Sequence, residues 1–405
     1  MTILAELIEI HLGRIATLIE EQKFNEAENV AETLLTIDPN STQIMQLYGI
    51  ILCIQGKHED SLKTLLKLIN VEKSIVNYIN LSQAYLGVRD FENAILALRN
   101  ALEIDPDNIE VHVSLGYAYF LTGEWEKGWI HWDYRLKTWK PPEKLVNFFP
   151  QDKQWNGESL KDKSILLYCE QGIGDFIHFI RFAPQLKELG ADVFIGTTES
   201  LAPLLKSFGN LVIKPVGENK YNYHCSVCSL PRLLGVYAKG CTDTIPYFHV
   251  DRLDLSEYKD NFKIGIAWTG NPAHPQNQYR SCSLNDFDNI SSLPNVKVFS
   301  LQKDISVANT NVIDMSKHMT DFMGTAQIIQ AMDLIITVDT SILHLAGALG
   351  KETWALIAHN PDWRWTLKGN KTVWYNSVTL FRQEEPKNWH PVFVKIESKL
   401  NERIN

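Results

Sequence analysis

Residues 333–351 read DLIITVDTSILHLAGALGK, and this stretch decides the fold class of most of the chain. Residues 334–338 form a short apolar run with the length and composition of a strand that is buried on both faces. The polar turn 339–341 follows, and the apolar segment 342–349 is then long enough for a short helix. Strand, tight turn and helix in this order are the repeating unit of a parallel α/β sheet, so the sequence predicts that fold class.

The same alternation of strands and helices extends over the last two thirds of the chain, in two blocks. Apolar runs in the first block, residues 163–255, lie at 165–169, 193–196 and 211–213, and those in the second, residues 256–405, lie at 263–268, 296–300, 334–338 and 354–357. We therefore expect two Rossmann-like halves with a seam near residues 250–262. Ligands of such sheets bind at the carboxyl ends of the strands, so a cleft between the halves is expected.

A repeat of about 34 residues organises the first 140 residues. Asp38-Pro39 returns as Asp105-Pro106 after 67 residues, which is two periods. Small residues recur at intervals of 34, 33 and 34, at Ala27, Ser61, Ala94 and Gly128. A small residue once per repeat lets two antiparallel helices approach closely, and proline ends the second helix. The sequence thus predicts an α-helical solenoid for residues 1–140.

All 11 tryptophans lie at or beyond residue 125. Trp125, Trp129 and Trp132 are spaced i, i+4 and i+7, so they line one face of the last repeat helix. We expect this face either to dock the repeats onto the following domain or to fill the core of the last repeat. Pro141-Pro142 ends the helix, and residues 141–162 are expected to be a linker.

The composition argues against several classes of function. A net charge of −9 disfavours nucleic acid as a partner. The chain has no apolar run close to 18 residues, so no membrane span is expected, and six cysteines in 405 residues fit a reducing compartment, which favours the cytoplasm. His224-Cys225-x-x-Cys228 has zinc-like spacing but lacks a second pair of ligands, so neither a metal nor another cofactor is expected.

The polar turn 339–341 is the first candidate for chemistry. The free backbone N–H groups at a helix start, two hydroxyl groups and His344 one turn later suit an anion such as a phosphate. Simple N-capping by Asp339 or Thr340 is the alternative, and a histidine in the position of His344 is often only a packed core residue.

Residues 8–139 resemble about four tetratricopeptide repeats, of which residues 74–106 are the best copy. The resemblance implies a superhelix whose groove holds a peptide or a protein partner. In the related O-GlcNAc transferases an Asn recurs at one groove position, and here Asn80 matches it whereas Leu47 and Ser114 do not. A spacer or a dimerisation element is the alternative, which keeps a homodimer open.

The rest of the chain resembles the family-9, heptosyltransferase-like glycosyltransferases of GT-B fold. The segments that carry this resemblance are GIGDFIHFIRFAPQLKELGADVFIG, GIAWTGNP, YRSCSL, FSLQKD, DLIITVDTSILHLAGALGK and NPDWRWTLKG. They are most similar to a bacterial subgroup in which tetratricopeptide repeats precede the transferase domain, and which includes flagellin glycosyltransferases. The resemblance implies a glycosyltransferase whose second half binds a nucleotide sugar.

The resemblance also implies roles for individual residues. The donor phosphate is expected at Asp339, Thr340, Ser341 and His344, with Lys303 and Arg280 as cations that stabilise the leaving group or, alternatively, as surface ion-pair partners. Further donor contacts are expected from Gly172, Gly174, Trp268, Asn271, Trp363 and Arg364, although the two indoles could instead be core residues. Asp175 matches the general base proposed for the family, with His178 and Glu170 as rivals and helix capping as its other role.

Together these expectations describe a metal-independent, inverting glycosyltransferase. It would move a sugar from a nucleotide sugar to a hydroxyl of a protein acceptor, similar to flagellin, that the repeat groove presents. Two alternatives stay open: a saccharide or lipid-linked acceptor, and a scaffold whose transferase domain is not catalytic.

Overall fold

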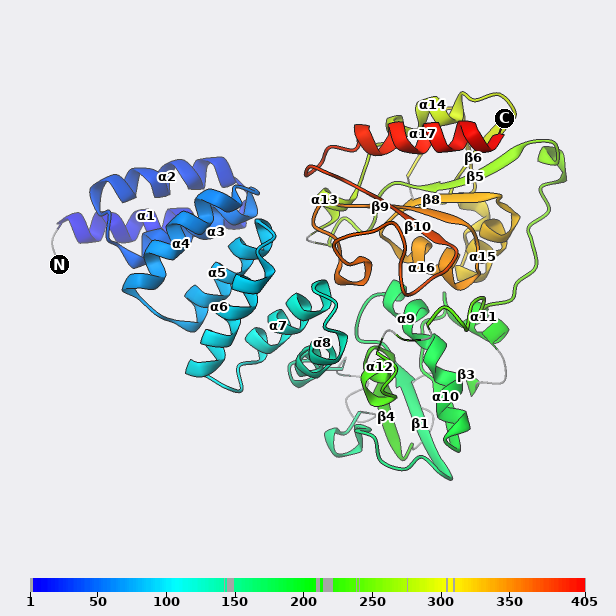
Figure 1. Cartoon of the computed structure of the whole chain (residues 1–405), viewed down its shortest axis with the longest axis horizontal. Helices are drawn as coiled ribbons and strands as arrows, with labels where there is room; N and C mark the ends of the chain where they lie inside the picture. Colours follow the sequence, from blue (N-terminus) through cyan, green and yellow to red (C-terminus); the bar gives the residue numbers. More distant parts are fainter. Residues whose placement is uncertain are drawn as a thin grey trace. The chain divides into compact units, whose positions relative to one another are not determined.

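The computed structural model describes residues 3–141, 143, 149–208, 212–213, 221–237, 239, 241–274, 276–303, 305–308 and 310–404. The chain forms two compact units, Met1–Thr138 and Trp139–Asn405, and each is described by itself. Figure 1 shows helices alone in the first unit and alternating strands and helices in the second.

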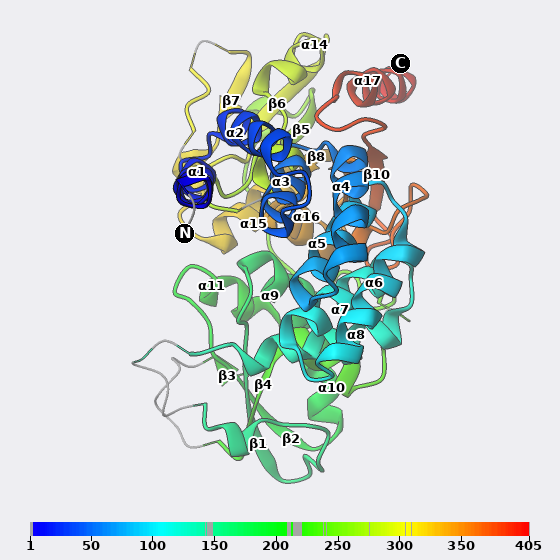
Figure 2. The ribbon, with the colours of Figure 1, turned by 90° about the vertical axis from the view of Figure 1, so that its left-hand side faces the viewer.

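The first unit consists of helices in consecutive antiparallel pairs, which Figure 2 shows from the side. They are α1 (Ile3–Glu20), α2 (Phe24–Ile37), α3 (Thr42–Ile54), α4 (His58–Val71), α5 (Ile75–Gly87), α6 (Phe91–Ile104), α7 (Ile109–Leu121) and α8 (Trp125–Trp132). Ala27, Ser61 and Ala94, the small residues that marked the repeat, are fully buried. A Cβ at Gly116 of α7 would lie 2.9 Å from the carbonyl oxygen of Gly128, so the last two helices pack through glycine.

The first helix of each later repeat begins at a side-chain cap. Ser41, Ser74 and Asn108 each accept a hydrogen bond from the backbone N–H three residues further on. These bonds satisfy N–H groups that have no partner within the helix. The caps recur at 33 and 34 residues, so they carry the same period as the small residues.

The tryptophan stripe of α8 packs within the repeat unit. Trp129 is fully buried, and Trp132 is 8% exposed. The ring of Phe120 in α7 lies 5.9, 4.8 and 6.1 Å, centroid to centroid, from Trp125, Trp129 and Trp132. Of the two roles expected for this face, the ring contacts support the core of the last repeat.

The second unit contains two parallel sheets, one in each half. The first half has the strand order β3-β2-β1-β4, with β1 (Lys163–Tyr168), β2 (Ala191–Ile195), β3 (Val212–Ile213) and β4 (Tyr223–Ser226). The second half has the order β10-β9-β8-β5-β6-β7, with β5 (Phe262–Ala267), β6 (Val296–Ser300), β7 (Val312–Asp314), β8 (Leu334–Val338), β9 (Thr353–Ile357) and β10 (Val378–Arg382). Parallel strands with helical crossovers in both halves confirm the expected GT-B class.

Helices connect and cover these strands. In the first half they are α9 (Ile173–Phe179), α10 (Ala183–Glu188), α11 (Ala202–Leu205) and α12 (Leu230–Leu233). In the second half they are α13 (Asn277–Arg280), α14 (Asp288–Ser291), α15 (Phe322–Ala331), α16 (Ser341–Ala348) and α17 (His390–Ile404). A 3-10 turn, Ile180–Phe182, separates α9 from α10, because Pro184 lacks an N–H and starts a new helix.

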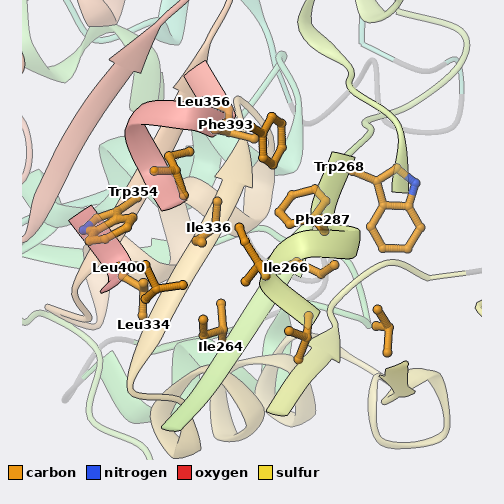
Figure 3. Packing of buried hydrophobic residues seen from close by; sticks show 14 of the residues in the cluster. Ile264, Ile266, Trp268, Phe287, Leu334, Ile336, Trp354, Leu356, Phe393 and Leu400 are labelled. Atoms are coloured by element: carbon orange, nitrogen blue, oxygen red, sulfur yellow. The ribbon is translucent and has the colours of Figure 1, made fainter. Parts of the chain in front are cut away.

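The core of the second half lies between its sheet and α17. Ile266, Ile336 and Leu356 from the central strands meet Phe393 and Leu400 from this last helix (Figure 3). The sheet is therefore a rigid base, and the polar turns at the ends of its strands are placed by that packing.

Candidate active site

The starts of two helices, α9 of the first half and α16 of the second, lie against each other. A Cβ at Gly174 would lie 3.1 Å from Cδ2 of His344 and 3.4 Å from Cα of Ser341. Glycine at 174 is therefore the residue that lets α9 approach the first turn of α16. The structure thus brings together the two segments to which the sequence assigned the base and the donor phosphate.

Thr340 stands at the N-cap of α16, directly after Asp339 at the end of β8. Its side chain makes no capping hydrogen bond, and its Oγ1 is buried with no hydrogen-bond partner among the described residues. A buried hydroxyl without a partner is costly unless something satisfies it. An anionic oxygen at the helix start would accept from this hydroxyl and from the free N–H groups of the first turn.

Arg280 of α13 reaches the same corner of the site. A Cβ at Gly270 would lie 2.7 Å from Nη2 of Arg280 and 3.2 Å from Cγ2 of Thr340, so the two side chains flank this glycine. The N–H of Gly270 donates to Oδ1 of Asn277 at 3.0 Å, which fixes the turn onto α13. Nε of Arg280 is buried and has no hydrogen-bond partner in the described part of the chain. A cationic donor and an unpaired hydroxyl therefore lie side by side.

Asp175 sits in the first turn of α9 and faces the second half. Its Oδ2 accepts a hydrogen bond of 3.0 Å from the N–H of Gly172, the N-cap residue, so the expected capping role is present. Its Oδ1 forms an ion pair with Nη2 of Arg364, which belongs to the second half. Burial raises the pKa of the Asp175 carboxyl, and the Arg364 guanidinium opposes this only in part.

Arg364 lies in the turn Trp363–Trp365, which comes after β9. Its Nη1 donates to Oδ1 of Asp362 at 2.9 Å, and its guanidinium stacks 4.2 Å from the ring of Trp363. Burial lowers the pKa of Arg364, but Asp362 and Asp175 more than offset this, so the pKa is raised. The guanidinium stays charged and links a carboxylate of each half.

Asp339 has a carboxyl group that titrates near neutrality. Burial, together with the nearby charge of Asp362, raises its pKa to about 7, although Trp365, Arg280 and Arg364 favour the ionised form. An anionic ligand at the start of α16 would raise this pKa further, because like charges repel.

His178 and His344 are core residues that share one hydroxyl. Nδ1 of His178 lies 2.8 Å and Nδ1 of His344 lies 3.0 Å from the Tyr375 hydroxyl oxygen. Burial holds the pKa of both imidazoles well below the ordinary value, so both rings are neutral. His178 is 0% exposed, so the structure shows its ring as a buried core residue. His344 is 5% exposed and stacks on Trp365.

The expectation that indoles wall the cleft is corrected by the structure. Trp268 is 5% exposed and packs in the core of the second half beside Phe287 (Figure 3). Trp363 is 2% exposed and lies 6.4 Å from the ring of Phe179 in a stacked arrangement. Both rings are core residues because their large apolar surface is buried on all sides.

Other expected residues lie on the surface. Lys303, in the turn after β6, and Asn271 are exposed, and Oδ1 of Asn271 accepts from the N–H of Ala273 at 3.0 Å. In the repeat unit Asn80 of α5 is half-buried, and its Nδ2 has no hydrogen-bond partner within the described ranges. Glu170, the third acidic candidate, accepts a hydrogen bond from the Ser226 hydroxyl.

The structure adds residues that the sequence did not single out. Arg181 is 2% exposed and donates 3.1 Å to the carbonyl of Cys241 and 2.7 Å to that of Trp374, so it ties the halves together behind the site. Tyr375 and Asp362 are two further residues that the sequence did not single out. Asp362 directly precedes the Trp363-Arg364-Trp365 motif, which was a usable signal, whereas nothing in the sequence around Arg181 or Tyr375 indicated a link between the halves.

Comparisons with known proteins agree with this architecture. Residues 90–123 match the family model of the TPR repeat, and residues 317–395 match that of glycosyltransferase family 9 (heptosyltransferase). The second match includes Asp339, Thr340, Ser341, His344 and Arg364.

Similar proteins include Protein FlbA of Caulobacter vibrioides (strain ATCC 19089 / CIP 103742 / CB 15), which is 21% identical over 433 residues covering 95% of this chain and 71% of that protein. Among solved structures, MamA from Desulfovibrio magneticus RS-1 is 21% identical over 32% of this chain and 73% of its own, with a TM-score of 0.30. A thermophilic TPR protein of Thermus thermophilus is 20% identical over 32% and 73%, also with a TM-score of 0.30.

None of the helices in the described ranges is both long enough and apolar enough to cross a bilayer. The chain joins a tetratricopeptide-repeat match to a glycosyltransferase family 9 match, its parallel sheets are consistent with the GT-B class, and the family 9 match supports a glycosyltransferase.

Proposed function

We propose that this protein is a metal-independent, inverting transferase that moves a sugar from a nucleotide-sugar donor to a hydroxyl group of a protein acceptor. The observation that carries the proposal is the meeting of the first turn of α9, which carries Asp175, with the start of α16 across the two halves. A base on one half and an anion site on the other suit in-line displacement at the sugar carbon.

The donor phosphate binds at the start of α16 in this proposal. The hydroxyl of Thr340 and Nε of Arg280 lack hydrogen-bond partners in the described structure, and the first N–H groups of a helix have none within that helix. A phosphate oxygen would accept from all of these groups. Arg280 carries the positive charge that offsets the charge growing on the leaving group, which is the role a divalent cation has in metal-dependent transferases. No step of the reaction then needs a metal ion.

Asp175 accepts the proton of the attacking hydroxyl in this proposal. Its ion pair with Arg364 favours the ionised carboxylate, against the opposing effect of burial. The charge of Arg364 also lowers the pKa of Asp339, so one guanidinium acts on a carboxylate beside each of the two helix starts.

Ligand-induced thermal stabilisation tests the donor class directly. The full chain is heated with UDP, GDP, ADP and CMP and with their sugars, and one of these should stabilise it by about 2.7 kcal/mol at a hundred times its dissociation constant. Arg280→Ala should lose this stabilisation, and Lys297→Ala, which removes an exposed cation of β6, should keep it. No stabilisation by any nucleotide would contradict the proposal and favour a scaffold without catalysis.

Transfer assays then test the chemistry. With the matching donor, the product should have the anomeric configuration opposite to that of the donor, and neither Mg²⁺ nor Mn²⁺ should be needed for the reaction. Retention of configuration would exclude Asp175 as a simple base and require a different mechanism.

The acceptor is proposed to be a protein because the transferase is joined to a repeat unit, and such units bind extended peptides in their groove. Asn80→Ala should raise KM for a protein acceptor, such as a flagellin-like protein, and leave donor binding unchanged. An equal rate on a saccharide or lipid-linked acceptor, with no effect of Asn80→Ala, would support the alternative acceptor class.

None of the cysteines in the described ranges forms a disulfide, which is in keeping with the cytoplasm as the proposed compartment.

A further inference from the structure

Two cysteines and a glutamate meet at the carboxyl edge of the first sheet, next to the loop that presents Asp175. Cys169 and Glu170 directly follow β1, and Cys228 lies in the turn directly after β4. These two strands are parallel neighbours in which Tyr168 pairs with Ser226, so their ends fix the two thiols side by side. Sγ of Cys169 lies 3.7 Å from Sγ of Cys228, and a Glu170 oxygen lies within 4.8 Å of both.

The separation of the two sulfur atoms matches metal coordination. Zinc binds thiolates at about 2.3 Å in a tetrahedron, which places two coordinating sulfurs about 3.8 Å apart. A disulfide needs a separation of about 2.05 Å, so a bond between these atoms would require the strand ends to move. The observed 3.7 Å therefore suits an ion between the thiols without rearrangement.

The carboxylate is held ready by a neighbouring hydroxyl. Oγ of Ser226 donates to Oε2 of Glu170 and accepts a hydrogen bond of 3.0 Å from the N–H of Cys228. Ser226 thus orients both the Glu170 carboxylate and the backbone of Cys228, as residues that surround the ligands of metal sites commonly do. The serine therefore holds the carboxylate beside the two thiols.

We propose that Cys169, Cys228 and Glu170 form a binding site for a thiophilic divalent cation, with Zn²⁺ the best match. Soft thiolates select zinc over magnesium or calcium, and three protein ligands leave a fourth position for water. The site differs from the zinc-like spacing at His224-Cys225-x-x-Cys228. Nε2 of His224 lies 2.9 Å from the carbonyl oxygen of Pro150, and Sγ of Cys225 lies 3.2 Å from that of Ser226.

The site is separate from the transfer chemistry proposed above. An ion there ties the end of β1 to the turn after β4 and so fixes the start of the loop from Glu170 to Asp175. Bound Zn²⁺ should therefore raise the melting temperature of the protein. Donor binding at α16 does not involve any of the three ligands.

Cobalt binding to the full-length, reduced and metal-free protein tests the proposal. One equivalent of Co²⁺ should bind with the thiolate-to-metal charge-transfer and tetrahedral ligand-field absorption of a Cys₂ site, and Zn²⁺ should displace it. Cys169→Ser, at a partly exposed position, should abolish these bands, and Glu170→Gln should weaken binding at least tenfold. Cys53→Ser, which removes a thiol of the repeat unit, should leave binding unchanged.

Two results would overturn the proposal. The first is a folded protein that gives no cobalt spectrum, or a spectrum that survives Cys169→Ser. The second is a protein that binds no metal but forms a Cys169–Cys228 disulfide with a hydroperoxide. In that reaction two thiols give two electrons and two protons to the peroxide, which becomes water and an alcohol, and the pair would be a redox couple. Both readouts are independent of transferase activity, so failure here leaves the proposed function to its own tests.

Discussion

Asp175 and Arg364 form an ion pair between α9 of the first half and the turn after β9 of the second half. The side chains are 23% and 7% exposed, so the pair is largely shielded from water. Arg364 is held on its other side by Asp362 and by the ring of Trp363. The carboxylate proposed as the base is thus tied to the half that would bind the donor.

Asp175→Asn should remove the base and keep the fold of the site. Asn can still accept the hydrogen bond from the N–H of Gly172, so the helix cap stays. We expect kcat to fall about 10²- to 10⁴-fold, the usual loss for a general base, with donor binding retained. Asp192→Asn, at an exposed carboxylate of β2, is the control and should keep full activity. An Asp175→Asn variant as active as Asp192→Asn would exclude this residue as the base.

Arg364→Gln should shift the acidic limb of the rate profile. The guanidinium lowers the pKa of Asp175 against the opposing effect of burial, so its loss raises that pKa further. The base works only when it is ionised, and activity should therefore fall at a higher pH than in the parent protein. The variant should also lose up to about 3 kcal/mol of stability, because Asp175 and Asp362 both lose their partner.

Arg364→Lys serves as the matched change, since it keeps the charge but not the paired geometry. Its acidic limb should stay close to that of the parent. If the acidic limb of the pH–rate profile is the same in the parent and both variants, Arg364 does not influence the pKa of the base.

The raised pKa of Asp339 predicts that the protein becomes less stable as the pH rises. Its pKa is about 7 in the folded protein against 3.8 ordinarily, so the folded state binds the proton more tightly between these values. The free energy of unfolding must then decrease from about pH 4 to about pH 7. The shift corresponds to at most about 4 kcal/mol, and less is expected because Asp339 is only half-buried.

Urea unfolding at pH 5 and pH 8 measures this effect. Asp339→Asn cannot ionise, so it should gain stability relative to the parent when the pH is raised from 5 to 8. A difference between the two proteins that is the same at both pH values would mean that Asp339 titrates normally.

Gly174→Ala should separate the two helix starts. The added methyl group would lie 3.1 Å from Cδ2 of His344, so α9 or α16 must shift, at a cost of about 1 kcal/mol or more. We expect a lower melting temperature and a higher KM for the donor. Gly172→Ala is the paired control, because its Cβ would lie 3.4 Å from the Asp175 carboxylate and its φ is −72°. Equal effects of both changes would argue against a special role for the contact at Gly174.

The order of strands and helices could largely be predicted from the sequence. The run at 334–338 is β8 itself, because a continuous apolar segment bounded by polar turns specifies a buried strand. β4 was not predicted, since Tyr223–Ser226 mixes aromatic, histidine, cysteine and serine side chains without an apolar run. β7 has only three residues, which is too short for any periodic signal.

The site was predictable only where its residues lie in strand-to-helix turns. The turns at Asp175 and Asp339–Ser341 stand out because parallel sheets place such turns at one edge. Asp175 and Arg364 are 189 residues apart, and no motif or spacing in the sequence indicated that they form a pair. The burial of Trp268 and Trp363 was equally hidden, because an indole suits a ligand wall and a core alike.

The Tyr375 hydroxyl that lies between His178 and His344 restricts the tautomers of the two rings. A hydroxyl has one proton and can donate to only one of the two Nδ1 atoms, so at least one ring must carry its own hydrogen there. Nε2 of His178 is buried with no partner in the described structure, and a bare lone pair costs less at that place than an unpaired N–H. His178 therefore carries its hydrogen on Nδ1 and donates it to the hydroxyl oxygen of Tyr375. Burial also keeps the imidazole of His344 uncharged at neutral pH, so this ring adds no charge of its own to the anion site at the start of α16.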